Sequence, residues 1–232
     1  MILYRCFAWA ERARETAPDG PRWFPRAFQG EGRHDNPDVY GCLYLADREV
    51  SAVVEQLARF RGRHLTPELL VRRGLPLAIA ALELPERAQL IDLDDPTVLA
   101  DHELKPSLVA TRHGKVTQPQ ALALHRQHRF AAGLRWWSEF EAFWANYTIF
   151  ERAQRRLSVN SVRRLHIADA AVSEAADFLG LRGAWQRERT EAAASMRRPR
   201  VSREPSPARG RGQPGRIVPK SPSDSSFGPA VK

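Results

Sequence analysis

The sequence has few of the features that mark secreted, membrane-spanning or zinc-binding proteins. Its only cysteines are Cys6 and Cys42, and they form no CxxC pair, so neither a disulfide framework nor a zinc site is predicted. It contains no run of about 18 apolar residues, and the apolar run at its start is too short for a signal peptide. We therefore expect a soluble protein of the cytoplasm that has no contact with a membrane.

Several signature motifs of common enzymes are also absent. The sequence has no GxxxxGK[ST], no GxSxG and no HExxH. His125 and His128 have the spacing of neighbours on one helical face, but no third metal ligand is evident near them, so surface or interface histidines are the favoured interpretation. Trp136, Trp137 and Trp144 are interpreted as packing residues. No bound metal is predicted.

Large apolar residues are scarce in residues 197–232, which are rich in proline, serine, glycine and arginine. Burial in such a segment cannot offset its loss of conformational entropy, so a disordered tail is predicted. The tail has nine Lys or Arg and two acidic residues, a net charge of +7, which leaves +2 for residues 1–196. The charge distribution therefore favours a solvated basic tail, with weak nucleic-acid contact by the tail as the alternative, and predicts no basic face on the domain.

The remaining sequence predicts one α+β domain over residues 1–183, with mixed β-sheets and flanking helices. Residues 184–196 are expected to extend it as a polar helix. The expected strands cover residues 1–9, 40–46, 76–84, 88–93, 134–138 and 146–150, and the expected longer helices cover residues 48–60, 117–131 and 169–179.

Two of these helices have a predicted starting residue. Asp47 is the expected N-cap of a helix whose apolar residues recur at i, i+3, i+4 and i+7. These apolar residues are Val50, Val53, Val54 and Leu57. Thr117 and Gln120 have the spacing of a capping box, which places a second helix start at Thr117.

Several segments of the sequence share a pattern with one protein family. Residues 30–37, GEGRHDNP, contain a Gly-Arg-x-x-x-Pro loop; residues 43–46 read LYLA, and residues 52–55, AVVE, lie on the expected helix. Thr117-Gln118 and residues 133–138, GLRWWS, follow in the same order. Together these segments resemble the RES domain, a family named for an arginine, a glutamate and a serine. The resemblance extends from about Tyr4 to Leu181, with a bulkier and more acidic connection after Ser138 than the family pattern has.

The resemblance implies a fold similar to ADP-ribosyltransferases and an enzyme that destroys NAD⁺. The implied reaction is hydrolysis or phosphorolysis of the nicotinamide-ribose bond, with NAD⁺ as substrate. It also implies a toxin that pairs with an Xre-type antitoxin containing a helix-turn-helix domain. The site residues that it implies are Arg33, Tyr44, Glu55 and Ser138.

The chemistry of these four residue types suits that reaction. Cleavage of the nicotinamide bond builds positive charge on the ribose, which the Glu55 carboxylate would stabilise. Arg33 would hold the pyrophosphate or anchor the loop of the site. Tyr44 would stack on nicotinamide or ribose, and Ser138 would hydrogen-bond the ribose or fix the carboxylate. Periodicity alone, however, places Glu55 opposite the apolar stripe and facing solvent.

Two other functions stay open at this point. The same fold could transfer ADP-ribose to a macromolecule, or the chain could be a non-catalytic interaction protein whose basic tail binds nucleic acid. The acceptor of the ribosyl group, the presence of an antitoxin and the formation of a homodimer are not determined by the sequence.

Overall fold

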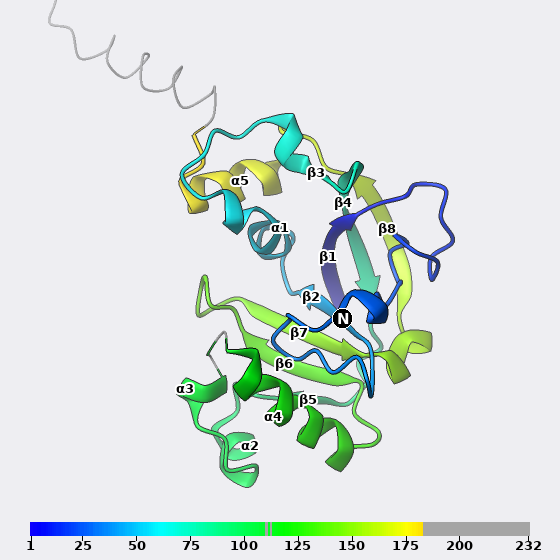
Figure 1. The fold of residues 1–232 in the computed structure, drawn as a ribbon, viewed down its shortest axis with the longest axis vertical. Helices are drawn as coiled ribbons and strands as arrows, with labels where there is room; N and C mark the ends of the chain where they lie inside the picture. The colour runs from blue at the N-terminus through cyan, green and yellow to red at the C-terminus, as the bar shows by residue number, and fades with distance from the viewer. Residues whose placement is uncertain (110, 112, 183–232) are drawn as a thin grey trace, which may run out of the picture. The chain divides into compact units, whose positions relative to one another are not determined.

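The computed structural model describes residues 1–109, 111 and 113–182. They form an α+β domain with one mixed sheet and flanking helices, which confirms the predicted fold class (Figure 1). The predicted polar extension at residues 184–196 and the predicted tail at residues 197–232 lie outside the described residues. Within the described part of the chain, no helix is long and apolar enough to cross a membrane.

Eight strands of the described residues form the sheet, in the order β3-β4-β1-β2-β7-β6-β5, with β8 also paired to β4. The strands are β1 (Ile2–Ala8), β2 (Cys42–Ala46), β3 (Val71–Arg72), β4 (Leu75–Glu83), β5 (Leu90–Asp92), β6 (Gly133–Trp137), β7 (Ala145–Phe150) and β8 (Ser158–Arg164). The α-helices are α1 (Glu49–Leu57), α2 (Pro96–Asp101), α3 (Pro106–Val109), α4 (Gly114–Gln127) and α5 (Ala170–Leu179). Short 3₁₀ helices cover Arg26–Phe28, Ala58–Phe60, Pro67–Leu70 and Glu151–Arg156.

The pairing between β1 and β2 divides the sheet into two halves. β1 pairs with β4 along its whole length, and β2 pairs with β7 along its whole length. Between β1 and β2, however, the register contains one residue pair, Tyr4 with Ala46. The two strands therefore separate beyond this pair, and the halves of the sheet are joined at one end of the seam.

Helices α1 and α5 cover the half of the sheet that contains β1 and β4 (Figure 1). The predicted apolar stripe of α1 is buried: Val53, Val54 and Leu57 have no exposed surface. They pack against Val172 and Leu179 of α5 in one cluster. Alternate residues of β4 point to the opposite face of the sheet, where a second buried cluster lies.

The predicted N-cap of α1 is wrong by one residue. The helix begins at Glu49, and Arg48, with extended backbone, occupies the N-cap without a side-chain hydrogen bond. The helix expected at residues 169–179 agrees with α5, and two other helix ends have ordinary caps. Asp95 caps α2 by accepting a bond from the Thr97 amide, and α5 ends at Gly180, whose φ of 65° favours glycine.

The other half of the sheet is covered by α2, α3 and α4, which lie beside β5 and β6 (Figure 1). Leu124 of α4 packs there against Leu134 of β6 and Phe150 of β7. The predicted capping box is wrong, because α4 begins at Gly114 and Thr117 lies inside it. The Thr117 hydroxyl instead donates to the backbone carbonyl of Arg33 at 2.5 Å. This bond attaches α4 to the loop that carries Arg33.

Candidate functional site

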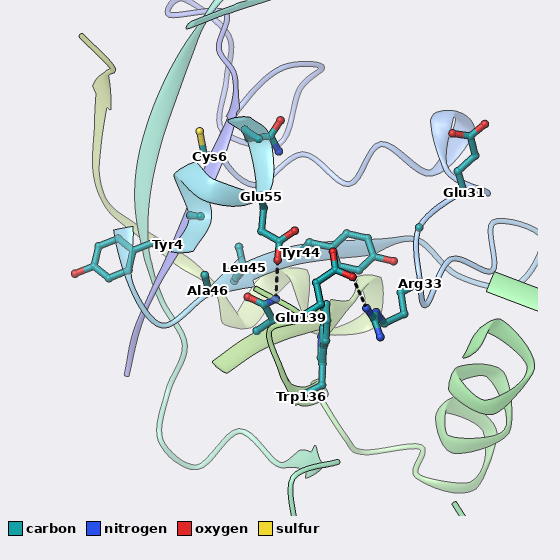
Figure 2. A pocket seen from close by; sticks show the side chains of 14 residues that line it. Tyr4, Cys6, Glu31, Arg33, Tyr44, Leu45, Ala46, Glu55, Trp136 and Glu139 are labelled. Carbon is teal, nitrogen blue, oxygen red and sulfur yellow. Dashed lines mark hydrogen bonds and ion pairs between the residues drawn. The ribbon is translucent and has the colours of Figure 1, made fainter. Parts of the chain in front are cut away.

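A cavity of about 390 Å³ lies under α1, where the two halves of the sheet meet. Figure 2 shows the Arg33, Tyr44 and Glu55 side chains around it, from a loop, from β2 and from α1. Its lining residues are Tyr4, Cys6, Glu31, Gly32, Arg33, Tyr44, Leu45, Ala46, Ala52, Glu55, Gln56, Trp136, Glu139 and Asn146. Three of the four predicted site residues therefore line one cavity, and Ser138 is not among them.

Glu55 points from the polar face of α1 into this cavity (Figure 2). One of its carboxylate oxygens accepts a hydrogen bond from the Asn146 amide nitrogen at 2.9 Å. Asn146 is 3% exposed, and its backbone is held on both sides by pairing with Ala46 and Trp136. The sheet therefore fixes the direction in which the Glu55 carboxylate points.

Asp35 organises the loop that brings Arg33 to the cavity. Its carboxylate accepts hydrogen bonds from the amides of Gly30 and Gly32, at 2.8 and 2.7 Å. It also accepts one from the Tyr44 hydroxyl at 2.7 Å. Any side chain at position 32 would clash, because a Cβ there would lie 2.6 Å from both the Asp35 carboxylate and the Tyr44 hydroxyl.

The Tyr44 hydroxyl joins this loop to the sheet. It donates to Asp35 and accepts a bond from the backbone amide of His34 at 2.9 Å. Burial raises the pKa of Tyr44 well above its ordinary value, and nearby Cys42 and Asp35 raise it further. The hydroxyl therefore stays protonated and acts as a fixed donor to the loop, while one side of the residue lines the cavity.

Replacing Tyr44 with phenylalanine removes this hydroxyl and leaves the ring in place. Both the Asp35 carboxylate and the His34 amide lose a partner, so we expect the free energy of unfolding to fall by about 1–3 kcal/mol. Urea unfolding of the full-length chain measures this change. An unchanged unfolding midpoint would show that the hydroxyl does not hold the loop.

Arg33 is largely engaged with the protein. Its side chain is 9% exposed, and its guanidinium stacks on Trp136, 4.6 Å from the ring centroid. One nitrogen donates to the Val109 carbonyl at 2.8 Å, and another lies 3.5 Å from a Glu139 carboxylate oxygen. Arg33 therefore joins the loop, β6 and the connection that follows β6.

A second layer of polar groups holds Trp136 in position. The Trp136 indole donates to the Thr148 hydroxyl at 3.1 Å, and the Nδ1 atom of His34 lies 2.8 Å from the same oxygen. Burial, together with the nearby charge of Arg33, lowers the pKa of His34 to about 3. The Nδ1 atom of a neutral His34 can accept a hydrogen bond from the Thr148 hydroxyl, which in turn accepts the bond from the Trp136 indole.

Ser138 lies behind the cavity lining. It is 2% exposed, and its hydroxyl oxygen accepts a bond from the Phe140 amide at 3.2 Å. Its own amide donates to the Trp144 carbonyl at 2.8 Å. Ser138 thus shapes the connection between β6 and β7, and its neighbour Glu139 reaches the cavity.

The comparison with protein families decides the classification of the chain. The model of the RES domain family matches residues 2–195. The chain belongs to the RES family. Its fold is similar to that of a chain in the crystal structure of the M. tuberculosis MbcT-MbcA toxin-antitoxin complex, with a TM-score of 0.51 and 18% identity over 78% of this chain and 88% of that chain. A search of curated proteins finds no match.

Several cavity residues of this RES domain were not predicted as site residues. Trp136 was interpreted as packing, and it does pack, but it also lines the cavity beneath Arg33. Asn146 carried a usable signal, since asparagine is uncommon in β-strands and its predicted strand also contains Ile149 and Phe150. Glu31 and Glu139 lie outside regular strands and helices, where periodicity gives no information.

His125 and His128, interpreted from the sequence as surface or interface histidines, are both partly exposed and have different neighbours. Burial lowers the pKa of His125 to about 4, and its ring stacks on Tyr40 at 4.2 Å. His128 instead faces His102, with the two Nε2 atoms 3.1 Å apart. In the described residues, no three His, Cys, Asp or Glu side chains are grouped as they would be around a metal ion.

Proposed function

We propose that this RES domain is a toxin-like enzyme that consumes NAD⁺ by breaking the bond between nicotinamide and ribose. The observation that carries the proposal is the Glu55 carboxylate, which faces the cavity and is oriented by Asn146 at 2.9 Å. Departure of nicotinamide leaves positive charge on the ribose carbon and ring oxygen. A fixed carboxylate beside that charge lowers the energy of the transition state.

The charges around the cavity support a cationic group in the same place. Glu31, Glu55 and Glu139 line it, whereas Arg33 is the one basic residue among its lining residues. The nicotinamide ring of NAD⁺ is positively charged before cleavage, and the ribose becomes so during cleavage. An acidic cavity therefore favours both the substrate end and the transition state.

The four predicted site residues have distinct parts in this proposal. Glu55 is the catalytic residue, and Tyr44 contacts the substrate while its hydroxyl holds the loop. Arg33 binds the substrate at the edge of the cavity and keeps Trp136 and Glu139 in place. Ser138 is a positioning residue, because its contacts are with the connection that carries Glu139.

The experiment is to mix the purified full-length chain with NAD⁺ and to follow nicotinamide by chromatography. We expect nicotinamide to be released, with ADP-ribose as the second product in plain buffer. Added inorganic phosphate separates the two reactions, since phosphorolysis produces a phosphorylated ADP-ribose that mass spectrometry distinguishes. A folded protein that neither binds NAD⁺ nor releases nicotinamide would contradict the proposal.

We further propose an antitoxin partner of the Xre type, with a helix-turn-helix domain, because the RES family and the toxin-antitoxin complex with a similar fold both favour one. An antitoxin would inhibit the enzyme by covering the cavity or closing access to it. Co-expression of this chain with the adjacent reading frame tests the pairing: recovery of a complex without NAD⁺ consumption is expected.

A further inference from the structure

A second cavity of about 300 Å³ lies in the gap where β1 and β2 separate. It shares three lining residues, Cys6, Tyr44 and Gln56, with the cavity that contains Glu55. The two hollows are therefore neighbours along the same seam of the sheet. A ligand that occupies both hollows must pass these three shared residues, and it must be longer than one ring and one sugar.

The two cavities differ in the sign of their charge. The first is lined by three carboxylates and one arginine. The second is lined by Arg5, Arg72 and Arg73, with Asp19 as its one acidic lining residue. A dinucleotide such as NAD⁺ has the same polarity, with a cationic nicotinamide at one end and an anionic pyrophosphate further along.

The three arginines of the second cavity are not equivalent. Arg5 is buried and donates to the carbonyls of Gly20 and Pro21, at 3.0 and 2.7 Å, so it is a structural group. Arg72 and Arg73 are exposed, at the end of β3 and in the turn to β4. They are the basic groups of this cavity that a ligand from solvent can reach.

The backbone and the neighbouring side chains hold these two arginines at the cavity. Arg73 and Gly74 have φ angles of 54° and 78°, so they form a tight turn between β3 and β4. Arg72 donates to the Gln56 side-chain oxygen at 2.7 Å, and Arg73 pairs with Asp19. Gln56 directly follows Glu55, so Arg72 is linked to the helix that carries the carboxylate.

An aromatic pair also lines this cavity. Trp23 and Phe28 both line it, with ring centroids 6.0 Å apart in an edge-to-face arrangement. Phe28 is 75% exposed, which leaves most of its ring available to a ligand. Exposed aromatic rings beside arginines are the groups that bind a base and its phosphates.

We propose that the second cavity binds the adenosine and pyrophosphate half of the dinucleotide, with Arg72 and Arg73 contacting the phosphates and Phe28 contacting the adenine. The inference rests on the proposed function and extends it by assigning the substrate's second half to residues outside the RES-family pattern. It also gives Arg33 a part other than phosphate binding, since Arg33 lines the first cavity and not the second, where we place the phosphates.

The test uses two probes that lack nicotinamide, ADP and inorganic pyrophosphate, and measures their binding to the full-length chain by calorimetry. Arg72→Ala removes a charge-assisted contact, so the affinity for both probes is expected to fall about tenfold or more. Phe28→Ala is expected to weaken ADP binding alone. Arg61→Ala, an exposed arginine outside both cavities, is the matched control and leaves both affinities unchanged.

The outcomes separate this inference from the proposed function. Equal binding of ADP to the wild type, Arg72→Ala and Phe28→Ala would overturn the inference, even if nicotinamide is released normally. Loss of ADP binding in Arg72→Ala supports the inference. If the wild type binds ADP in this way but releases no nicotinamide, the inference stands and the proposed reaction fails. Thermal unfolding of Arg72→Ala and Phe28→Ala at the same temperature as the wild type excludes misfolding. Arg72→Lys is expected to restore part of the pyrophosphate affinity.

Discussion

Replacing Glu55 with glutamine is expected to reduce the rate of nicotinamide release by about a thousandfold. Glutamine has nearly the same shape and can still contact Asn146, but it carries no negative charge. The positive charge that develops on the ribose then has no compensating group at that position. Substrate binding is expected to change much less, since the lost interaction strengthens mainly in the transition state. Single-turnover kinetics with NAD⁺ measure the chemical step directly.

A matched change elsewhere separates this effect from general damage. Glu174 lies on the exposed face of α5 and does not line the cavity, so Glu174→Gln is expected to keep wild-type activity. Urea unfolding of both variants is expected to give midpoints near that of the wild type. A Glu55→Gln protein that releases nicotinamide at the wild-type rate would remove the carboxylate from the mechanism.

Local patterns predicted most strands and helices, and the exceptions have physical causes. β8 was missed because its two partly buried valines, Val159 and Val162, are three residues apart. The register between β8 and β4 shifts at this point, so one residue of β8 is left over and the alternation with period 2 is lost. The strand β5 was predicted from its own residues, whereas its parallel pairing with β6 is a long-range contact that no local pattern indicates.

Thr117 shows why a capping pattern can mislead. The spacing of Thr117 and Gln120 suits a helix start, yet the helix begins three residues earlier. Thr117 is 1% exposed, and its hydroxyl donates to the carbonyl of Arg33, a residue far away in the sequence. A buried hydroxyl needs a partner, and here the Arg33 carbonyl is a closer one than the local His113 carbonyl, which lies 3.5 Å away.

The candidate site could be predicted only in part. Periodicity placed Glu55 opposite the apolar stripe of α1, which is correct, but only the tertiary structure shows that this face borders a cavity. Arg33 and Tyr44 were selected from the family resemblance. Ser138 was selected in the same way, but it follows the end of β6 at Trp137, is buried with its hydroxyl bonded to the Phe140 amide, and does not line the cavity.

Replacing Arg33 with alanine is the second change for which we expect a large effect, a loss of about a hundredfold in kcat/KM. The variant loses the stacking contact with Trp136, the bond to Val109 and the ion pair with Glu139. Trp136 keeps its bond to Thr148, but the ring loses the cation that covers it, and Glu139 loses one of the contacts that place it at the cavity. Lysine cannot stack or bridge in the same way, so Arg33→Lys is expected to recover little activity.

The control for this prediction is Arg126→Ala, which removes an arginine from the exposed end of α4 and leaves the cavity lining intact. Its kcat/KM is expected to equal that of the wild type. The Arg33→Ala protein is also expected to show altered indole fluorescence together with its lower activity, because the guanidinium no longer covers the Trp136 ring. Full activity of either Arg33 variant would mean that the loop reaches its position without the guanidinium, and Asp35 with Tyr44 would then suffice to hold it.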